Sequence, residues 1–157
     1  MGSVVQRDEL VDIRKRLARE GKRVVFTNGC FDLLHVGHVE YLQKAKSLGD
    51  ILIVGINDDA SVRRLKGPPR PITPQDDRTR IIAALASVDY TCLFSEDTPL
   101  NLITAIRPDV LVKGADWPVD AVVGKDLVES LGGAVRTIDF IPNRSTTGII
   151  AKIRESR

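Results

Sequence analysis

The sequence lacks several features that would place it in a specialised class of protein. It has only two cysteines, too few for a disulfide framework, which favours a reducing, cytoplasmic environment. It has no stretch approaching the ~20 apolar residues that a membrane-spanning helix needs, and no signal peptide opens it. Its formal net charge of +2 comes from 23 basic and 21 acidic residues, so no basic surface predicts binding to nucleic acid. We therefore expect a cytoplasmic protein that acts on neither a membrane nor a nucleic acid.

No internal repeat or linker-like segment divides the chain, so its 157 residues predict one domain with room for a hydrophobic core. Apolar residues make up 43% of the chain and charged residues 28%, as in ordinary globular proteins. No set of residues has the pattern of a serine or cysteine catalytic triad. A covalent enzyme nucleophile is therefore not expected, and Cys30, beside the apolar Phe31, is interpreted as a packing residue.

The only two histidines, His35 and His38, lie in a glycine-containing loop between a predicted strand at 23–27 and a helical pattern at 39–48. Such a strand–loop–helix junction presents free backbone N–H groups and the positive end of a helix dipole, which together suit an anion. At a spacing of three residues, the imidazoles can share one helix face. Gly37 between them has no Cβ, so a ligand can approach the backbone closely. The loop therefore predicts a phosphate-binding site.

Two other interpretations of the histidine pair remain open. Histidines at this spacing can chelate zinc, with Cys30 and Asp32 as the nearby candidates for the remaining ligands. Alternatively, both are ordinary residues at the start of a helix. The neighbouring glycines and the strand–loop–helix context favour the phosphate interpretation over both.

A second candidate segment, Ser61–Pro71, predicts a stiff, basic, irregular loop, because it contains three prolines and a glycine among its cations. It is either a solvated charge run or a lid that supplies cations to phosphates. After it, Thr73 is the predicted N-cap of a helix with Pro74 at the first position. The cations of the segment are Arg63, Arg64, Lys66 and Arg70.

Two further candidates lie in the last third of the chain. Ser145, Thr146 and Thr147 start the final predicted helix, where hydroxyls and free N–H groups form a second anion site in addition to simple capping. The only tryptophan, Trp117, lies in the loop 113–117 after a predicted strand. It either stacks on a base or sugar or packs in the core.

Predicted strands and helices alternate along the chain, which indicates a parallel sheet with helices on both faces. We expect an α/β fold with a Rossmann-like, doubly wound, five-stranded parallel sheet in the order 3-2-1-4-5. This order places strands one and four side by side at its reversal point, where ligands bind outside the carboxyl ends of the strands. The histidine loop and the loop 113–117 follow these two strands, so one crevice is expected to hold both. The predicted strands are 23–27, 51–56, 90–94, 110–112 and 135–140, and the predicted helices are 7–20, 39–48, 73–86, 98–106, 125–131 and 145–153.

His35-Val36-Gly37-His38 matches the HxGH signature of the nucleotidyltransferase superfamily that includes the cytidylyltransferases. The run from Thr27 to His38 resembles, more specifically, the D-glycero-β-D-manno-heptose 1-phosphate adenylyltransferases. The resemblance extends from about Lys22 over nearly the whole remaining chain, through Arg-Leu-Lys-Gly followed by Arg-Pro, Lys-Gly-Ala-Asp-Trp and Ser-Thr-Thr. Three positions depart from the pattern of these relatives: Ala115 replaces a glycine, and Arg144 and Gly148 flank the Ser-Thr-Thr triplet.

The resemblance implies a single nucleotidyltransferase domain over residues 1–157, with an N-terminal helix in 1–21 and a nucleotide-binding core in 22–157. The reaction it implies transfers AMP from ATP to D-glycero-D-manno-heptose 1-phosphate, by in-line displacement at the α-phosphorus. The products are ADP-heptose, for lipopolysaccharide or capsule synthesis, and pyrophosphate. Mg²⁺ is expected, bound mainly through the ATP phosphates.

Many relatives carry a sugar-kinase domain as well, and the chain is expected to be a stand-alone form without it. Its kinase and phosphatase partners would then be encoded separately. A homodimer or larger homo-oligomer is also expected, and the amphipathic helix at 7–20 is either a packing helix or an oligomer contact.

The resemblance also implies roles for individual site residues. The implied catalytic residues are His35, His38 and Lys66. The implied sugar-phosphate-binding residues are Asp32, Asp116 and Trp117, and no residue is expected to bind a metal directly. The implied nucleotide- and phosphate-binding residues are Thr27, Asn28, Gly29, Cys30, Phe31, Gly37, Arg78, Lys113, Gly114, Arg144, Ser145, Thr146 and Thr147.

Two other functions remain open at this point. A cytidylyltransferase acting on glycerol 3-phosphate or phosphoethanolamine would use the same motifs with CTP. A catalytically silent nucleotide-binding module would keep the fold alone. The joint presence of the histidine pair, the lysine segment and the Ser-Thr-Thr triplet favours an enzyme.

Overall fold

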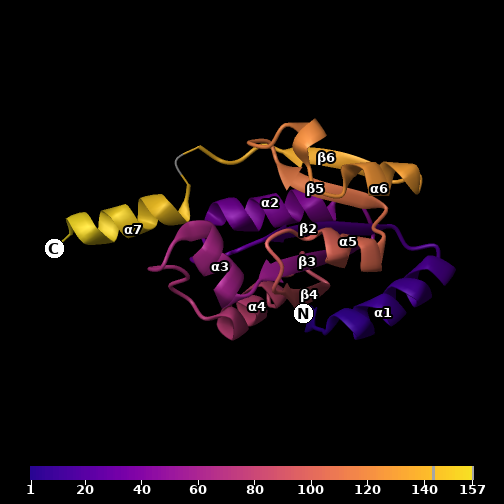
Figure 1. Ribbon diagram of the computed structural model, residues 1–157, viewed down its shortest axis with the longest axis horizontal. Helices are drawn as coiled ribbons and strands as arrows, with labels where there is room; N and C mark the ends of the chain where they lie inside the picture. Colours follow the sequence, from indigo (N-terminus) through magenta and orange to yellow (C-terminus); the bar gives the residue numbers. More distant parts are fainter. Residues whose placement is uncertain (143, 157) are drawn as a thin grey trace.

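The computed structural model describes residues 1–142 and 144–156, which form a six-stranded parallel sheet with helices on both faces. The strands lie in the order β1-β4-β3-β2-β5-β6. In Figure 1 they descend from β6 at the top to β4 at the bottom. Their bounds are β1 Ser3–Val4, β2 Val24–Gly29, β3 Ile51–Asn57, β4 Tyr90–Phe94, β5 Val110–Gly114 and β6 Ala134–Ile138.

The prediction of five strands is wrong, because the sheet has a sixth strand at its edge. The five predicted strands keep the expected order 3-2-1-4-5 among themselves, as β4-β3-β2-β5-β6. The sixth strand, β1, pairs in parallel with β4, with Ser3 opposite Tyr90 and Val4 opposite Thr91. It has only two residues, too few to produce a periodic pattern in the sequence. The order of the sheet reverses between β2 and β5, where Val25 lies opposite Val110. The predicted reversal point is therefore present.

Seven α-helices connect or follow the strands in the described residues. Their bounds are α1 Arg7–Arg19, α2 Val36–Lys46, α3 Asp59–Lys66, α4 Gln75–Ala83, α5 Leu100–Ile106, α6 Lys125–Ser130 and α7 Thr146–Glu155, with one 3₁₀ turn at Val119–Ala121. The sheet and these helices enclose two cores, one on each face. Successive residues of β2 alternate between them: Val24 and Phe26 pack with α1, α5 and α6, whereas Val25 packs with α2 and α4. This burial on both faces explains why the central strands are continuous apolar runs.

The predicted irregular loop at 61–71 is wrong over its first half, which is helical. Helix α3 begins after Asp58, whose carboxylate accepts a hydrogen bond from the N–H of Ser61 at 2.7 Å. It ends at Gly67, whose φ of 96° belongs to the region that favours glycine. The predicted N-cap at Thr73 is also wrong, because α4 is capped by Pro74 and no side chain accepts a capping bond there. The prolines and cations of the segment favour an irregular loop in the sequence pattern, whereas Asp58 is the residue that indicates a helix.

Helix α1 is a packing helix of this domain. Leu10 and Leu17 on its apolar face are buried in the core shared with α5, and Arg14 pairs with Asp109 at 3.1 Å. Because this apolar face is covered within the chain, it does not support the predicted oligomer contact. Oligomerisation itself remains a prediction.

Helix α7 differs from the other helices because it extends away from the sheet (Figure 1). It buries none of its described residues fully, and Ile153 is 57% exposed. Its N-terminus nevertheless lies against the histidine loop, where the hydroxyl of Thr146 donates a hydrogen bond to the carbonyl of Leu33 at 3.2 Å. The fold therefore brings the start of α7 to the carboxyl ends of the strands.

Candidate active site

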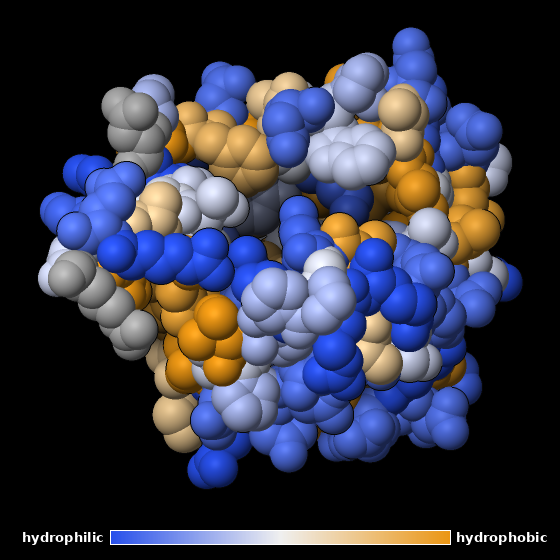
Figure 2. Space-filling view, turned by 60° about the vertical axis from the view of Figure 1, so that its left-hand side comes forward, coloured by the Kyte–Doolittle hydropathy of each residue, from blue (hydrophilic) through white to orange (hydrophobic). Residues whose placement is uncertain are grey.

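A cavity of about 890 Å³ opens at the carboxyl ends of the strands, on both sides of the reversal point. Figure 2 shows this side of the molecule, with a hollow bordered by hydrophilic and hydrophobic residues. Cavities that hold small molecules commonly have volumes of about 300–1,000 Å³. The lining comes from the loop after β2, from α3, from the loops after β4 and β5, and from the start of α7. The two loops predicted to share one crevice therefore do so.

The rings of His35 and His38 are stacked in this cavity, with centroids 3.8 Å apart and planes inclined by 23°. His35 is the N-cap residue of α2, and the N–H of His38 donates to the carbonyl of His35 at 2.9 Å. The Nδ1 atoms of both rings are buried without a hydrogen-bond partner among the described residues. The two rings therefore line the cavity without a hydrogen bond at Nδ1 from a described residue to hold either of them, and the Nδ1 atoms themselves are not exposed to a ligand.

Burial lowers the pKa of both imidazoles. The pKa of His38 falls to about 4, first through desolvation and then through the proximity of His35. Desolvation lowers the pKa of His35 as well. His38 is thus neutral at pH 7, and a neutral imidazole has one N–H donor and one acceptor. The stacked pair can donate hydrogen bonds to a phosphate without carrying a fixed charge.

Two glycines shape the loop around the histidines. A Cβ on Gly37 would lie 2.9 Å from Nδ1 of His35, so the bare backbone leaves room for that ring. A Cβ on Gly29 would lie 2.9 Å from the ring of Phe31, which meets His38 edge-on with centroids 5.2 Å apart. Phe31 itself has a φ of 47°, an unusual value for a bulky residue and one that recurs at functional sites. The glycines therefore make space for aromatic rings, and the resulting loop holds the histidines in place.

Lys113 joins the two central strands at the floor of the cavity. Lys113 belongs to β5, and its amino group donates a hydrogen bond to the side-chain carbonyl of Asn28 in the neighbouring strand β2. Desolvation lowers the pKa of Lys113 to about 8, against an opposing effect of Asp116. Lys113 is therefore still mostly protonated at pH 7 and provides a partly buried positive charge.

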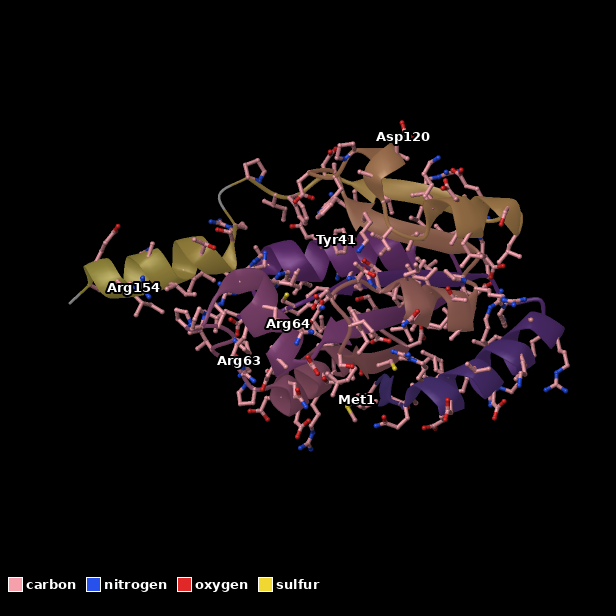
Figure 3. All side chains as sticks on the ribbon, viewed as in Figure 1. Met1, Tyr41, Arg63, Arg64, Asp120 and Arg154 are labelled. Atoms are coloured by element: carbon pink, nitrogen blue, oxygen red, sulfur yellow. The ribbon has the colours of Figure 1, made fainter. Side chains whose placement is uncertain are left out.

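The segment Ser61–Pro71 supplies two cations to the cavity wall, Lys66 from the end of α3 and Arg70 from the turn after it. Lys66, the last residue of this helix, lines the cavity, whereas Arg63 and Arg64 do not. Arg64 pairs with Asp97 at 2.6 Å and also donates to the carbonyl of Ser95. Figure 3 shows both arginines along α3. The structure thus separates Lys66 from its two basic neighbours.

The start of α7 brings a second set of N–H groups to the cavity. Ser145 caps the helix, and its hydroxyl accepts a hydrogen bond from the N–H of Gly148 at 3.0 Å. Arg144 and the three hydroxyl residues all line the cavity. The N-terminus of α2 lies next to the start of α7 at the histidine loop, so two positive helix ends adjoin the same cavity. An extended anion such as a polyphosphate fits this arrangement.

Most residues predicted for the site are brought together around this one cavity, and three are not. Thr27 is buried beneath it, where its hydroxyl lies 2.8 Å from the hydroxyl of Tyr41. Gly37 is buried beside His35, and Arg78 is fully buried between the loops. The cavity includes the predicted residues Asn28, Gly29, Cys30, Phe31, Asp32, His35, His38, Lys66, Lys113, Gly114, Asp116, Trp117, Arg144, Ser145, Thr146 and Thr147.

Two aromatic residues of the cavity were missed in the sequence. Tyr41, labelled on α2 in Figure 3, stacks on Phe140 with ring centroids 5.8 Å apart. Tyr41 lies three residues after His38, so helical spacing could have placed it on the histidine face. Phe140 follows the carboxyl end of β6, which was a usable signal as well. Gly114 accommodates this ring, because a Cβ there would clash with Cζ of Phe140.

Cys30 lines the cavity but is not an activated nucleophile. Burial raises the pKa of its thiol, although Lys66, Arg78 and Arg70 act in the opposite direction. A thiol with a raised pKa is mainly protonated at neutral pH and reacts slowly. Its carbonyl, by contrast, accepts a hydrogen bond from Arg78 at 2.5 Å.

The zinc interpretation of the histidine pair gains no ligand set from the structure. In residues 1–142 and 144–156, no group of three or more His, Cys, Asp or Glu side chains is arranged to hold a metal ion. The carboxylate of Asp32, one of the candidate ligands, is occupied by Arg70 at 2.5 Å.

Over residues 1–142 and 144–156, no helix combines the length and the apolar character needed to cross a membrane.

Comparison with known proteins assigns this arrangement to a family. Residues 26–152 match the family model described as cytidylyltransferase-like. The bifunctional proteins HldE of Syntrophotalea carbinolica and Geobacter sulfurreducens are each 60% identical to the chain, over 147 and 146 residues. These matches cover 94% and 93% of the chain but 30% of each relative. The chain therefore spans about a third of the length of the curated relatives it matches.

Two solved structures are also similar to the chain. The lipopolysaccharide core biosynthesis protein of Thermoplasma volcanium is 31% identical, with a TM-score of 0.63 over 77% of this chain and 98% of its own. The pantoate-beta-alanine ligase of Francisella tularensis has a TM-score of 0.65 over 98% of this chain and 77% of its own. Its identity of 18% supports likeness of fold alone.

Proposed function

The chain belongs to the cytidylyltransferase-like family and is a nucleotidyltransferase, and on this premise we propose that it is a heptose 1-phosphate adenylyltransferase. The reaction is the transfer of AMP from ATP to D-glycero-D-manno-heptose 1-phosphate, with release of pyrophosphate. The observation that carries this proposal is the stacked histidine pair between two helix N-termini and two lysines, in a cavity large enough for a nucleotide and a sugar phosphate. The identity of 60% to bifunctional proteins HldE supports the choice of substrates.

The proposed mechanism is direct in-line displacement. An oxygen of the sugar phosphate attacks the α-phosphorus of ATP, the bond from that phosphorus to the bridging oxygen breaks, and pyrophosphate leaves. Such a step needs positioning and charge stabilisation but no protein nucleophile, in agreement with the protonated thiol of Cys30. His35 and His38 donate hydrogen bonds to the α-phosphate and the leaving group as negative charge develops there.

The cations and helix termini hold the remaining phosphates in this proposal. Lys66 neutralises the β- and γ-phosphates from α3, and the start of α7 binds them through Thr146 and Thr147. Lys113 provides a further positive charge at the floor of the cavity. Asp116 and Trp117 are proposed to contact the sugar, since both line the cavity and Trp117 is 55% exposed.

Mg²⁺ is proposed to enter with ATP. It would be held mainly through the phosphate oxygens of ATP. When bound, Mg²⁺ supplies positive charge to the triphosphate. Every role assigned above belongs to a residue of this chain.

The experiment that tests the proposal is pyrophosphate release over a grid of nucleotides and acceptors. The grid combines ATP and CTP with heptose 1-phosphate, glycerol 3-phosphate and phosphoethanolamine. We expect turnover with ATP and heptose 1-phosphate, and little with the smaller acceptors. A site built to pair sugar hydroxyls rejects analogues that lack them, because its own polar groups remain unpaired.

A cytidylyltransferase is the second candidate, favoured by the family model that the chain matches. Turnover of CTP with glycerol 3-phosphate or phosphoethanolamine, and none of ATP with heptose 1-phosphate, would replace our proposal with this one. Nucleotide binding without turnover of any pair would instead indicate a silent module.

A further inference from the structure

Two charged side chains beside the cavity, Asp32 and Arg78, are buried so completely that neither has exposed side-chain surface. Buried charges are costly unless they are paired and hydrogen-bonded. Asp32 belongs to the histidine loop, and Arg78 belongs to α4. Their hydrogen-bond partners lie in loops, at the end of β3 and in α3, so each side chain connects segments that are distant in sequence.

Asp32 connects the histidine loop to the segment that follows Lys66. Its carboxylate accepts hydrogen bonds from Nε of Arg70 at 2.5 Å, from the N–H of Ile72 at 2.8 Å and from the N–H of Thr73 at 2.8 Å. Burial alone would raise the pKa of Asp32, but these donors hold it below its ordinary value. The group is therefore a charged acceptor whose oxygens are already occupied.

Arg78 connects the same two loops from the opposite side. Its guanidinium donates to the carbonyl of Cys30 in the histidine loop at 2.5 Å and to the carbonyl of Thr73 at 3.0 Å. It also donates to the carbonyl of Asn57 at the end of β3 and to the carboxylate of Asp59 in α3, both at 2.8 Å. One side chain thus joins the histidine loop, β3, α3 and the start of α4.

We infer that Asp32 and Arg78 are positioning residues, which fix Lys66 relative to the histidine pair by clamping the segment 67–74 against the histidine loop. Lys66 itself is exposed at the end of α3, followed by Gly67 with its φ of 96°. The clamped contacts begin four residues later, at Arg70. Asp32 therefore acts through the placement of Lys66 and not through contact with a sugar, since its side chain has no exposed surface.

This inference rests on the proposed function, because it assigns a role in transfer to Lys66. The test is a double-mutant cycle of Asp32→Asn and Lys66→Ala, with kcat and KM measured on whichever nucleotide and acceptor pair the grid finds active. Misplacement of a catalytic group by about 1 Å can cost up to ~10²-fold in rate. We expect Asp32→Asn to lower kcat about tenfold in the wild-type background, and less than about threefold when Lys66 is already absent.

The control variant is Glu96→Gln, which makes the same chemical change at a carboxylate that also accepts from an arginine and a backbone N–H, although its side chain is 29% exposed. Glu96 accepts hydrogen bonds from Arg7 at 2.7 Å and from the N–H of Ser95 at 3.1 Å, but it does not line the cavity. It should leave kcat unchanged in both backgrounds. Arg78→Lys, which keeps the charge but loses the planar set of donors, should repeat the coupling to Lys66 if Asp32→Asn does not fold.

An equal loss of kcat from Asp32→Asn in both backgrounds would overturn the inference, as would a lowered Tm with unchanged kcat in the folded variant. If no nucleotide and acceptor pair is turned over, the proposed function fails separately. The cycle is then read as ATP affinity, from the emission of Trp117 during a titration with ATP. Coupled losses of affinity would still support the clamp, and additive losses would overturn it.

Discussion

The imidazole rings of His35 and His38 lie face to face at 3.8 Å, and neither Nδ1 atom has a hydrogen-bond partner in the part of the chain that the structure describes. Burial, and for His38 also the proximity of His35, lowers the pKa of these rings, so the free protein holds the pair with its positive charge suppressed. A polyphosphate in the cavity would supply the missing negative charge. The pair is thus arranged to respond to an anion rather than to carry a permanent charge.

The first prediction concerns catalysis by this pair. Removing one preorganised donor to transition-state charge typically lowers kcat by about 10²–10³. We expect losses of this size from His35→Ala and from His38→Ala, with ATP binding and Tm largely retained. Steady-state pyrophosphate release, ATP titration and thermal unfolding measure the three quantities. Near-normal turnover in either variant would contradict the assigned mechanism.

The second prediction concerns protons. The pKa of His38 is about 4 in the free protein, so the ring is mostly unprotonated at about pH 6. Negative phosphate charge beside it would raise this pKa towards its ordinary value of 6.5. Binding of Mg²⁺–ATP at about pH 6 should therefore take up protons. Calorimetric titration in two buffers with different ionisation enthalpies measures this uptake, and His38→Asn should reduce it. Equal uptake by the variant would exclude His38 as the source.

The third prediction separates Lys66 from the other cations of α3. Lys66 lines the cavity, whereas Arg63 is exposed outside it. Lys66→Ala should lower kcat at least about tenfold, in line with the loss of a group that stabilises developing charge. Arg63→Ala, the matched control on the same helix, should change kcat less than twofold or so. Small and equal effects of both changes would reduce the segment to a solvated charge run.

The fourth prediction concerns the cost in folding stability of burying the charged side chain of Lys113. Burial lowers its pKa from 10.5 to about 8, so the unfolded chain binds more protons than the folded one between these two values. Stability should therefore rise with pH across this window. Lys113→Met should raise Tm at pH 7, by about 2–4 °C for each kcal/mol gained, while weakening nucleotide binding. The difference in Tm between Lys113→Met and the wild type should decrease towards pH 10.

The matched control for this prediction is Lys44→Met, at an exposed lysine of α2. Its Tm should differ little from that of the wild type, and the difference should not vary between pH 8 and 10. A lowered Tm in Lys113→Met would show that the hydrogen bond to Asn28 outweighs the burial of the charge.

The sequence predicted those elements that local pattern determines. The apolar runs at β2 and β3 are buried on both faces of the sheet, and this burial is visible as uninterrupted hydrophobicity. The two-residue strand β1 could not be predicted, because it exists only through its pairing with β4. The pattern does not predict helix α3, although Asp58 marks its start, because the prolines after Lys66 give the whole segment 61–71 the composition of an irregular loop.

The site was predictable in its location but not in its internal contacts. Loops at the carboxyl ends of β2 and β5 had to meet once the sheet order was inferred. The burial of Asp32 beneath Arg70 depends on how two loops, 38 residues apart in sequence, close on each other. No spacing in the chain encodes that closure, so the sequence alone predicts a ligand contact for a carboxylate beside the histidines. Tyr41 and Phe140 meet in the same way, across α2 and the end of β6.

The position of Trp117 makes its fluorescence a probe of ligand binding in the cavity. It is the only tryptophan in the chain, and its side chain is 55% exposed where it lines the cavity. All indole fluorescence therefore originates beside the ligand space, and none arises from the core. A nucleotide or sugar that covers the ring should shift the emission to shorter wavelength or quench it. The intrinsic tryptophan fluorescence of the unlabelled chain can therefore be used to measure the order, affinity and rates of substrate binding.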